Sequence, residues 1–406
     1  MLTSTLEPAL IGNRVIALVG LATGRTTVYG LVTFGGLLVA SVTQPVIGAL
    51  SDHARARTPY IIAGVLTSMA GLVVVALSPS LSILVAGLVL LQLGNNTALA
   101  SWQPLIATEI PERQRGLAAG IKALFDLVGA IAGRLAAGEW VAHYSDWGTS
   151  ALAGALALPA MGLLITLGLV VAYLRRRTPG PRAPPHALTW QAALRQSFVI
   201  DWRAHPAFVR WCINRVLFWC AFIASSVFLL FFSVDGLGMS EAEAQRYIGR
   251  LVVLLGAAVA LVIVPAGRLA DKLGRRPMMI VGGLLAAIGA ALVVAWRGQT
   301  IIASIVIGVG VGLYLSSSLA MINDIVPVSS AARYLGVANI ATVAGSAVAR
   351  LAGGFGVDAI NRLTGTHEVG FVALYAAASA LFFLSAAVMV VQHPSSKLPL
   401  DSPSMA

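Results

Sequence analysis

Stretches of about 20 apolar residues recur along this chain, and short charged connections separate them. A helix of about 20 residues spans the hydrocarbon core of a bilayer, so each stretch is a candidate membrane span. A twelfth, shorter candidate lies before residue 20 and contains Glu7, Asn13 and Arg14. The pattern predicts an all-α integral membrane protein. The eleven full-length candidates are residues 30–50, 60–78, 81–104, 116–138, 150–174, 207–232, 247–266, 278–296, 300–322, 333–353 and 369–392.

The composition argues against a soluble protein that binds nucleic acid. Only 11% of the residues are charged, whereas soluble domains carry about 25%. The formal net charge of +11 would suggest a nucleic-acid partner in a soluble protein. Here the bases cluster between apolar segments and form no basic stripe with exposed aromatic residues, so membrane topology explains them better. We therefore expect a lipid bilayer as the surroundings and no nucleic acid.

The connections alternate between base-rich and base-poor. Those at 51–59, 105–115, 175–206 and 267–277 are rich in arginine, and 323–332 leads into Arg333. The alternate connections, at 79–80, 139–149, 233–246, 297–299 and 354–368, hold at most one arginine each. By the positive-inside rule the base-rich set faces the cytoplasm. This predicts a multi-pass protein of the cell (inner) membrane with both termini in the cytoplasm.

The two halves of the chain repeat each other. Asp52 and Asp271 sit in similar segments 219 residues apart, and a second set of matches holds at a separation of 216. The repeat predicts two six-helix bundles related by pseudo-two-fold symmetry, at 1–174 and 207–392, with a linker at 175–206 and a cytoplasmic tail at 393–406. The prolines of the linker exclude helix there, and from Thr189 an interfacial amphipathic helix is predicted. The second set pairs Pro111 with Pro327, Gly120 with Gly336, Gly129 with Gly345, and Arg134-Leu135-Ala136 with Arg350-Leu351-Ala352.

The same repeat indicates that the first helix is incomplete. The first span of the second half begins near residue 207, and its counterpart would start about twelve residues before Met1 by this repeat spacing. Either the first helix is unusually short or the natural chain begins upstream. The second interpretation is favoured.

A charged segment joins two spans in each half. In the second half it reads GRLADKLGRRP, from Gly267 to Pro277, and in the first half GALSDHARARTP, from Gly48 to Pro59. The second-half segment resembles the signature G-x-L-[AS]-D-[RK]-x-G-R-[RK] of the major facilitator superfamily. The first copy departs from the signature at His53 and over 54–56, where the second glycine is missing. The residues carried over are Gly48, Asp52, Arg55, Arg57, Gly267, Asp271, Lys272, Gly274, Arg275 and Arg276.

The resemblance implies transport by alternating access, with two halves that rock about a substrate site near the midplane. The signature segments would be gates on the cytoplasmic side, where a carboxylate can pair with guanidinium groups and with a helix N-terminus. Alternatively, they set topology alone. We expect Asp271 and its arginines to hold that side more tightly than the Asp52 copy. The runs QPVIGALSD, IPERQRG and ARYLGVANIAT are similar to the cation-coupled sugar symporter-like branches.

Ionisable residues inside spans are costly and often mark transport pathways. Lys122 and Asp126 are four residues apart and share a helix face. Asp126 could accept the coupling proton, with Lys122 tuning it, or the two could form a structural ion pair. Glu7 is the second coupling candidate, with Arg14 as a possible partner. The coupling ion would be H⁺ or Na⁺.

Two spans contain polar residues that suit a substrate site. Arg215 lies between Trp211 and Trp219 at helical spacing, so it could hold an anionic or sugar-like substrate or be a packed structural cation. Asn95 and Trp102 are seven residues apart and share a face, as do Asn96 and Gln103. In the family the first, fourth, seventh and tenth helices line the cavity. The substrate candidates are Asn95, Asn96, Trp102, Arg215, Trp219 and Tyr314.

We therefore expect a monomeric secondary transporter, coupled to protons or another cation, that moves a small polar solute or exports a drug-like one. A membrane-embedded transferase is the second hypothesis, but no Asp-rich metal motif and no His cluster supports it. A transport-dead receptor on the same scaffold is the third. The chain has no GxxxxGK[ST] loop for ATP-driven pumping. No enzyme activity, metal or cofactor is expected.

Overall fold

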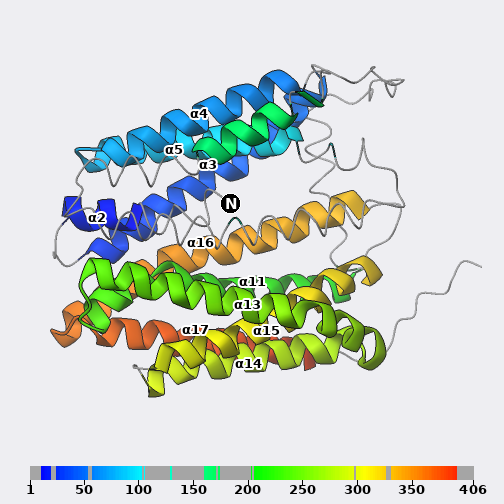
Figure 1. Cartoon of the computed structure of the whole chain (residues 1–406). Coiled ribbons are helices and arrows are strands. Elements are labelled where there is room, and N and C mark those ends of the chain that lie inside the picture. Colours follow the sequence, from blue (N-terminus) through cyan, green and yellow to red (C-terminus); the bar gives the residue numbers. More distant parts are fainter. Residues whose placement is uncertain are drawn as a thin grey trace, which may run out of the picture.

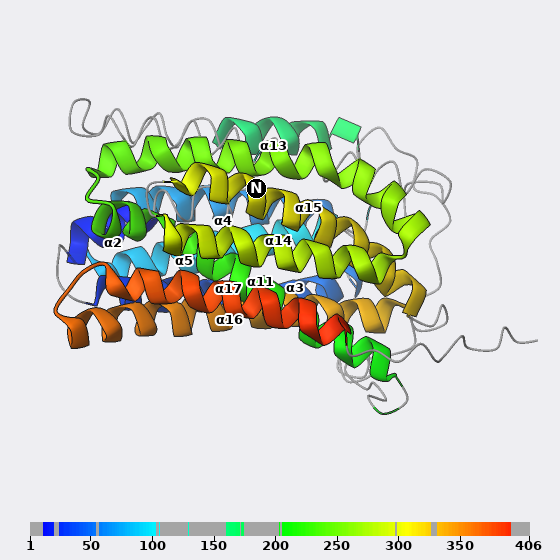
Figure 2. The same ribbon diagram turned by 90° about the horizontal axis from the view of Figure 1, so that it is seen from below.

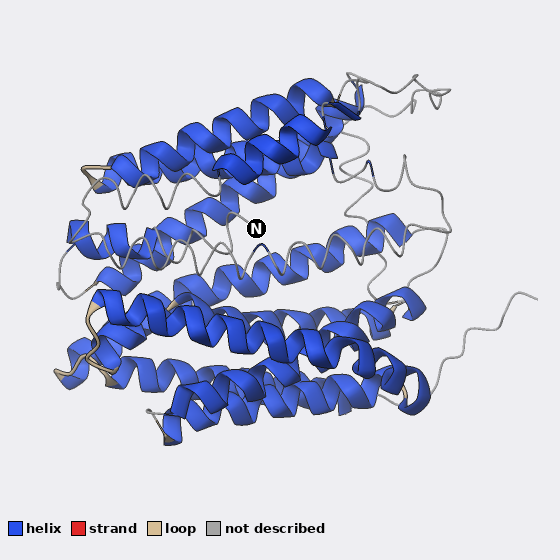
Figure 3. Cartoon of the chain, in the orientation of Figure 1, coloured by secondary structure: helices blue, strands red, loops and turns tan. Residues whose placement is uncertain are grey.

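The computed structural model describes residues 11–19, 24–53, 57–102, 160–170, 205–296, 299–325 and 331–390, with a few isolated residues between them. Within these ranges every regular element is a helix (Figure 3). Nine of the described helices are long and apolar enough to cross a membrane. The prediction of an all-α membrane protein with many spans is confirmed. The predicted span at 116–138 apart from Gly129, the first part of that at 150–174, most of the linker and the tail lie outside the described residues.

The described helices fall into two groups that follow the two predicted halves (Figure 1), and seen from below the second group lies in front of the first (Figure 2). Helix α16 of the second group packs against α3 of the first, so these two helices join the halves. The first group comprises α2 (Gly12–Val19), α3 (Arg25–His53), α4 (Thr58–Leu77) and α5 (Leu81–Trp102), and Ala160–Val170 forms a shorter apolar helix. The second comprises α11 (Pro206–Val227), α12 (Leu229–Phe231), the π-helix η2 (Phe232–Gly236), α13 (Glu241–Leu273), α14 (Arg275–Ala295), α15 (Thr300–Ile325), α16 (Ala331–Thr364) and α17 (Val369–Val390).

Several helices extend past the apolar stretches that predicted them. Helix α13 has 33 residues, and hydropathy predicted only 247–266. Its extra first turns begin at a capping box, in which the Ser240 side chain bonds the Glu243 backbone and the Glu243 side chain bonds the Ser240 backbone. Helix α3 runs to His53, which places Asp52 in its last turn instead of in a loop. Hydropathy marks only the part of a helix that suits hydrocarbon, and capping chemistry sets where the helix ends.

Glycines let pairs of helices approach closely at equivalent places in the two halves. A Cβ on Gly94 of α5 would lie 2.6 Å from the Gly64 carbonyl of α4. In the second half, a Cβ on Gly310 of α15 would lie 2.6 Å from the Gly282 carbonyl of α14. Small residues at such crossings are what membrane helices use to pack, because lipid supplies no hydrophobic drive for helices to associate. The internal repeat therefore appears in the packing as well as in the sequence.

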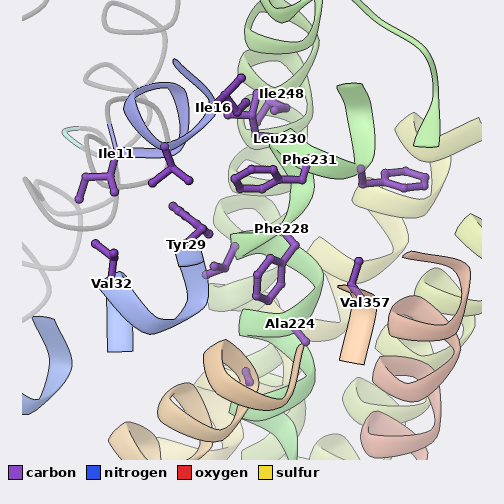
Figure 4. Close-up of a cluster of buried hydrophobic side chains, with 14 of the residues drawn as sticks. Ile11, Ile16, Tyr29, Val32, Ala224, Phe228, Leu230, Phe231, Ile248 and Val357 are labelled. Carbon is purple, nitrogen blue, oxygen red and sulfur yellow. The ribbon is translucent and has the colours of Figure 1, made fainter. Parts of the chain in front are cut away.

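The two ends of the molecule differ in what they hold. The end of α3 and the start of α4, together with the junction of α13 and α14, lie at one end, which we call the signature-loop end (Figure 1). The connections between α4 and α5 and between α16 and α17 lie at the other, which we call the far end. A shared apolar core joins the halves near the far end (Figure 4). There Tyr29 of α3 lies with its ring centroid 5.1 Å from that of Phe231 and 6.1 Å from that of Phe228.

Candidate functional site

Arg215 of α11 is the centre of a polar cluster inside the second half. Its guanidinium carbon lies 5.0 Å from the ring centroid of Trp211 and 5.8 Å from that of Trp219. These residues are four apart on one helix, so both indoles flank the cation, as the sequence spacing predicted. The Nε atom donates a hydrogen bond of 2.6 Å to Thr342 Oγ1 of α16. A longer bond of 3.4 Å runs from Nη1 to Ser318 Oγ of α15.

This cluster has hydrogen-bonding capacity left over. Arg215 and Trp219 are half-buried. Among the described residues, the buried Nε1 atom of Trp219, which flanks Arg215, has no hydrogen-bond partner. A buried polar atom left unpaired costs about 1–3 kcal/mol, and a guanidinium has five N–H donors, of which two are engaged here. The arrangement can therefore accept further oxygen atoms, from water or from a bound solute.

Tyr314 lies in the core of the second half, within electrostatic reach of Arg215. Its side chain is fully buried, and its ring stacks on Phe218 at 3.5 Å between centroids. Its hydroxyl donates to Asn214 Oδ1 at 2.8 Å, and Asn214 Nδ2 donates to Ser385 of α17. Tyr314 thus belongs to a network linking α11, α15 and α17. The sequence interpretation did not select Asn214, although a polar residue beside Arg215 inside a span was a signal for it.

In the first half the two predicted asparagines have different surroundings. Asn96 is buried, and its Nδ2 donates to the Gln92 carbonyl at 2.7 Å and to Gln92 Oε1 at 3.2 Å. Asn95 and Trp102 are half-buried. Gln92 packs against Gly36, so this polar pair faces α3. Among the described residues, no hydrogen bond joins Asn96 to the Arg215 cluster.

At the signature-loop end, the arginines of the second half contact their own half. Gly274 has φ +95°, a conformation that favours glycine, and joins α13 directly to α14. Arg275 forms an ion pair with Asp324 and donates to the Ala320 carbonyl, both near the end of α15. Arg276 donates to the carbonyls of Met389 and Val390, which end α17. These contacts neutralise the partial negative charge of two helix C-termini.

The remaining residues of the signature segments have fewer contacts described. Asp271 and Lys272 are exposed. Within the described residues, the ion pair of Arg275 is with Asp324 and not with Asp271. Arg57 directly precedes α4. The remaining predicted residues, Glu7, Arg55, Lys122 and Asp126, lie outside the described residues, as does the side chain of Asp52.

A second polar cluster, which the sequence interpretation missed, joins the halves at the far end. Arg25 of α3 forms an ion pair with Asp235 of η2, with an Nε–Oδ2 distance of 3.1 Å. Asp358 of α16 accepts hydrogen bonds from the Thr26 hydroxyl and the Thr27 backbone N–H. Helix α2 contributes Asn13, whose Oδ1 accepts a bond of 3.0 Å from Gln245 Nε2 of α13. The charged members, Arg25, Asp235 and Asp358, lie in or beside predicted connections, where charges are unremarkable, so only their pairing reveals them.

Two repeated helical halves, nine described helices of spanning character and a half-buried cation among polar side chains suit a membrane transporter better than an enzyme. The chain belongs to the Major Facilitator Superfamily, whose sequence model matches residues 15–249 and 216–404. The resemblance seen in the signature segments is thereby confirmed. Among curated protein sequences, none matches this chain.

Solved structures share the fold at low sequence identity. A bacterial homologue of the human lysosomal transporter Spinster, inward-facing and unoccupied, superposes with a TM-score of 0.70 at 16% identity, covering 97% of this chain and 96% of that chain. The same transporter in an inward-facing, occupied conformation gives a TM-score of 0.69 at 16% identity, covering 95% and 93%. A D-xylose–proton symporter gives 0.68 at 15% identity, covering 96% of both chains. These likenesses establish the two-domain fold.

Proposed function

We propose that this protein is a secondary active transporter that moves a small organic solute by alternating access, coupled to a proton or another cation. The surroundings of Arg215 indicate which kind of solute the protein binds. Arg215 is held between two indole rings by hydroxyl groups of α15 and α16. Such a site suits a solute with an acidic group, which a guanidinium binds through two parallel hydrogen bonds, and with a flat or sugar-like body that stacks on indole.

The alternative that Arg215 is only a structural cation is less well supported. Cations inside membrane spans almost always pair with an acid or with carbonyl groups. The partners of Arg215 among the described residues are two hydroxyls, and no carboxylate pairs with it there. A cation that has no counter-ion among the described residues and that is flanked by the unpaired Trp219 Nε1 is better explained by a ligand that brings the negative charge.

Alternating access also suits the distribution of contacts between the halves. The hydrogen bonds found between them among the described residues gather at the far end. By the loop charges this is the extracellular side, so the conformation is one closed to the outside. Coupling to protons is favoured because one neighbour of the same fold is a D-xylose–proton symporter. The coupling candidates Glu7, Lys122 and Asp126 stay predictions.

The first test is a thermal-shift screen of the purified protein against sugars, sugar acids, monocarboxylates, peptides and drugs. We expect acidic solutes to raise the unfolding temperature, because a ligand that binds only the folded state stabilises it. Hits would then be loaded into uptake assays with proteoliposomes that carry a pH gradient. A screen in which only cationic drugs stabilise the protein would contradict the role proposed for Arg215.

The role of the signature segment as a gate can be tested separately. In a cysteine-free background, a single cysteine at Ile340, which is 45% exposed on α16, would report access at the signature-loop end. If Asp271 helps to close that end, Asp271→Asn should change the labelling rate by about tenfold, the equivalent of ~1.4 kcal/mol. Arg250→Gln, which removes an exposed charge from the same helix outside the signature segment, serves as the control. If the parent and Asp271→Asn are labelled at the same rate, Asp271 serves only to set the topology and does not act as a gate.

A further inference from the structure

Ser318 of α15 contacts two members of the Arg215 cluster at once. Its side chain is fully buried. Its hydroxyl oxygen accepts from Arg215 Nη1 at 3.4 Å, and its backbone carbonyl accepts from Trp211 Nε1 at 3.2 Å. A single residue of α15 therefore holds both the guanidinium and one of the two indole rings that flank it.

The hydroxyl of Ser318 also belongs to a chain of hydrogen bonds that runs through the core of the second half. A side-chain hydrogen bond joins Ser318 to Tyr314, which lies one turn earlier on α15. The Tyr314 hydroxyl donates to Asn214 Oδ1 at 2.8 Å, and Asn214 Nδ2 donates to Ser385 Oγ of α17 at 2.8 Å. The chain thus connects the Arg215 guanidinium with groups on α15, α11 and α17.

The direction of each bond in this chain follows from the number of protons available. A serine, threonine or tyrosine hydroxyl has one proton to donate. The proton of Tyr314 goes to Asn214, so the bond between Tyr314 and Ser318 uses the proton of Ser318. The Ser318 oxygen can therefore only accept from Arg215. Thr342 is in the same state, because its hydroxyl donates to a carbonyl of its own helix at 3.3 Å while it accepts from Arg215.

Two such acceptors fix the orientation of the Arg215 guanidinium. Thr342 engages Nε and Ser318 engages Nη1. Of the five N–H donors of a guanidinium, two on Nη2 and one on Nη1 are left. Trp211 and Trp219 flank the group. The edge formed by the two Nη atoms is therefore the part of Arg215 that can still bind a carboxylate.

We propose that Ser318 and Tyr314 are positioning residues, which direct the Nη edge of Arg215 toward the acidic group of the solute. This inference rests on the solute site proposed above. Neighbouring hydrogen bonds in a buried chain polarise one another, so the Tyr314 hydroxyl strengthens the bond between Ser318 and Arg215. Without that hydroxyl, the proton of Ser318 loses its acceptor and can turn toward the guanidinium, which it repels.

The first test needs no solute. The tryptophans are replaced by fluorotryptophan, and the fluorine NMR signals of Trp211 and Trp219 are assigned by replacing each in turn with phenylalanine. Tyr314→Phe should shift both signals by more than their line widths, because the guanidinium between the two rings moves. Tyr375→Phe is the matched control and should leave both signals in place. Tyr375 is also a buried tyrosine whose hydroxyl donates to α11, at 3.0 Å to the Ser225 carbonyl.

Ser318→Ala keeps the test decisive if Tyr314→Phe does not fold. This variant removes the hydroxyl that accepts from Arg215 and keeps the backbone carbonyl that accepts from Trp211. It should shift the same two fluorine signals. The proposal is overturned if the folded variants leave both signals at the parent positions, or if Tyr375→Phe shifts them as much.

The second test measures affinity for D-glucuronate, an acid on a sugar ring, with D-glucose as its neutral counterpart. Tyr314→Phe and Ser318→Ala should each raise the Kd for D-glucuronate by about tenfold, the equivalent of ~1.4 kcal/mol. Tyr375→Phe should leave that Kd unchanged.

The outcome can be separated from that of the proposed function. If D-glucuronate binds through Arg215 with the same Kd in the parent, Tyr314→Phe and Ser318→Ala, the positioning role is wrong and the solute site stands. If the fluorine signals shift as expected but neither D-glucuronate nor any acid of the thermal-shift screen binds, Ser318 and Tyr314 do position Arg215 and the choice of an acidic solute is wrong.

Discussion

Uptake should fall by about 100-fold when Arg215 is replaced by glutamine. The variant loses the positive charge and the forked donor set that would hold an acidic solute, and charge-assisted hydrogen bonds are worth about 1.5–3 kcal/mol each. The measurement is initial uptake in proteoliposomes of a solute identified by the thermal-shift screen. Arg215→Lys should lie between parent and glutamine variant, because lysine keeps the charge and loses the planar fork that stacks between Trp211 and Trp219.

Arg210→Gln is the matched control, because it removes an arginine near the start of the same helix. We expect Arg210→Gln to transport at close to the parent rate. If Arg215→Gln folds, inserts into liposomes and takes up the solute as the parent does, Arg215 is a structural cation and the proposed solute site is wrong.

The second large effect concerns helix packing. Gly310→Ala should destabilise the protein by about 1–3 kcal/mol, the usual cost of overpacking a close contact. Its new Cβ would lie 2.6 Å from the Gly282 carbonyl and 2.7 Å from the Ala286 nitrogen, so α14 and α15 must move apart. Thermal unfolding can be followed with a thiol-reactive dye, because Cys212 and Cys220 are buried in the same half and become reactive when it unfolds.

Gly356→Ala makes the same substitution in α16, where nothing lies within 4 Å of the added Cβ. There the change should be neutral or stabilising by about 0.5–1 kcal/mol, since alanine favours helix over glycine. Equal unfolding midpoints for the two alanine variants would show that the α14–α15 crossing tolerates separation and is not a critical contact.

The positions of the membrane spans could be predicted from local sequence, whereas some helix ends could not. Apolar stretches located the spans because a bilayer demands about 20 apolar residues per crossing. The apolar stretches predicted α13 and α16 as shorter helices than the structure shows. The additional turns are polar and lie outside the hydrocarbon, where capping groups such as the Ser240–Glu243 pair and neighbouring helices stabilise them. The repeat of the signature segments predicted the two-half organisation, which the family match and the neighbouring structures confirm.

The candidate site was likewise predictable only in part. Trp211, Arg215 and Trp219 share one helix, so their spacing alone brought them together. Thr342 and Ser318, which hold the guanidinium, are 127 and 103 residues away along the chain. Tyr314 was selected by helix number, and the structure shows its hydroxyl donating to Asn214 in the core, within electrostatic reach of Arg215. Helix periodicity shows which residues share a face, whereas the direction of that face depends on the neighbours.

Membrane spans, their alternation and the internal repeat are encoded in hydropathy and loop charge, properties that each segment has regardless of its neighbours. The cap that Asp358 places on α3, the Arg25–Asp235 pair and the hydroxyl partners of Arg215 exist only once helices from distant parts of the chain are packed. The physical reason is that partition into lipid acts on one segment at a time. Buried polar pairing needs two segments held at a definite distance and rotation, and only the folded bundle supplies both.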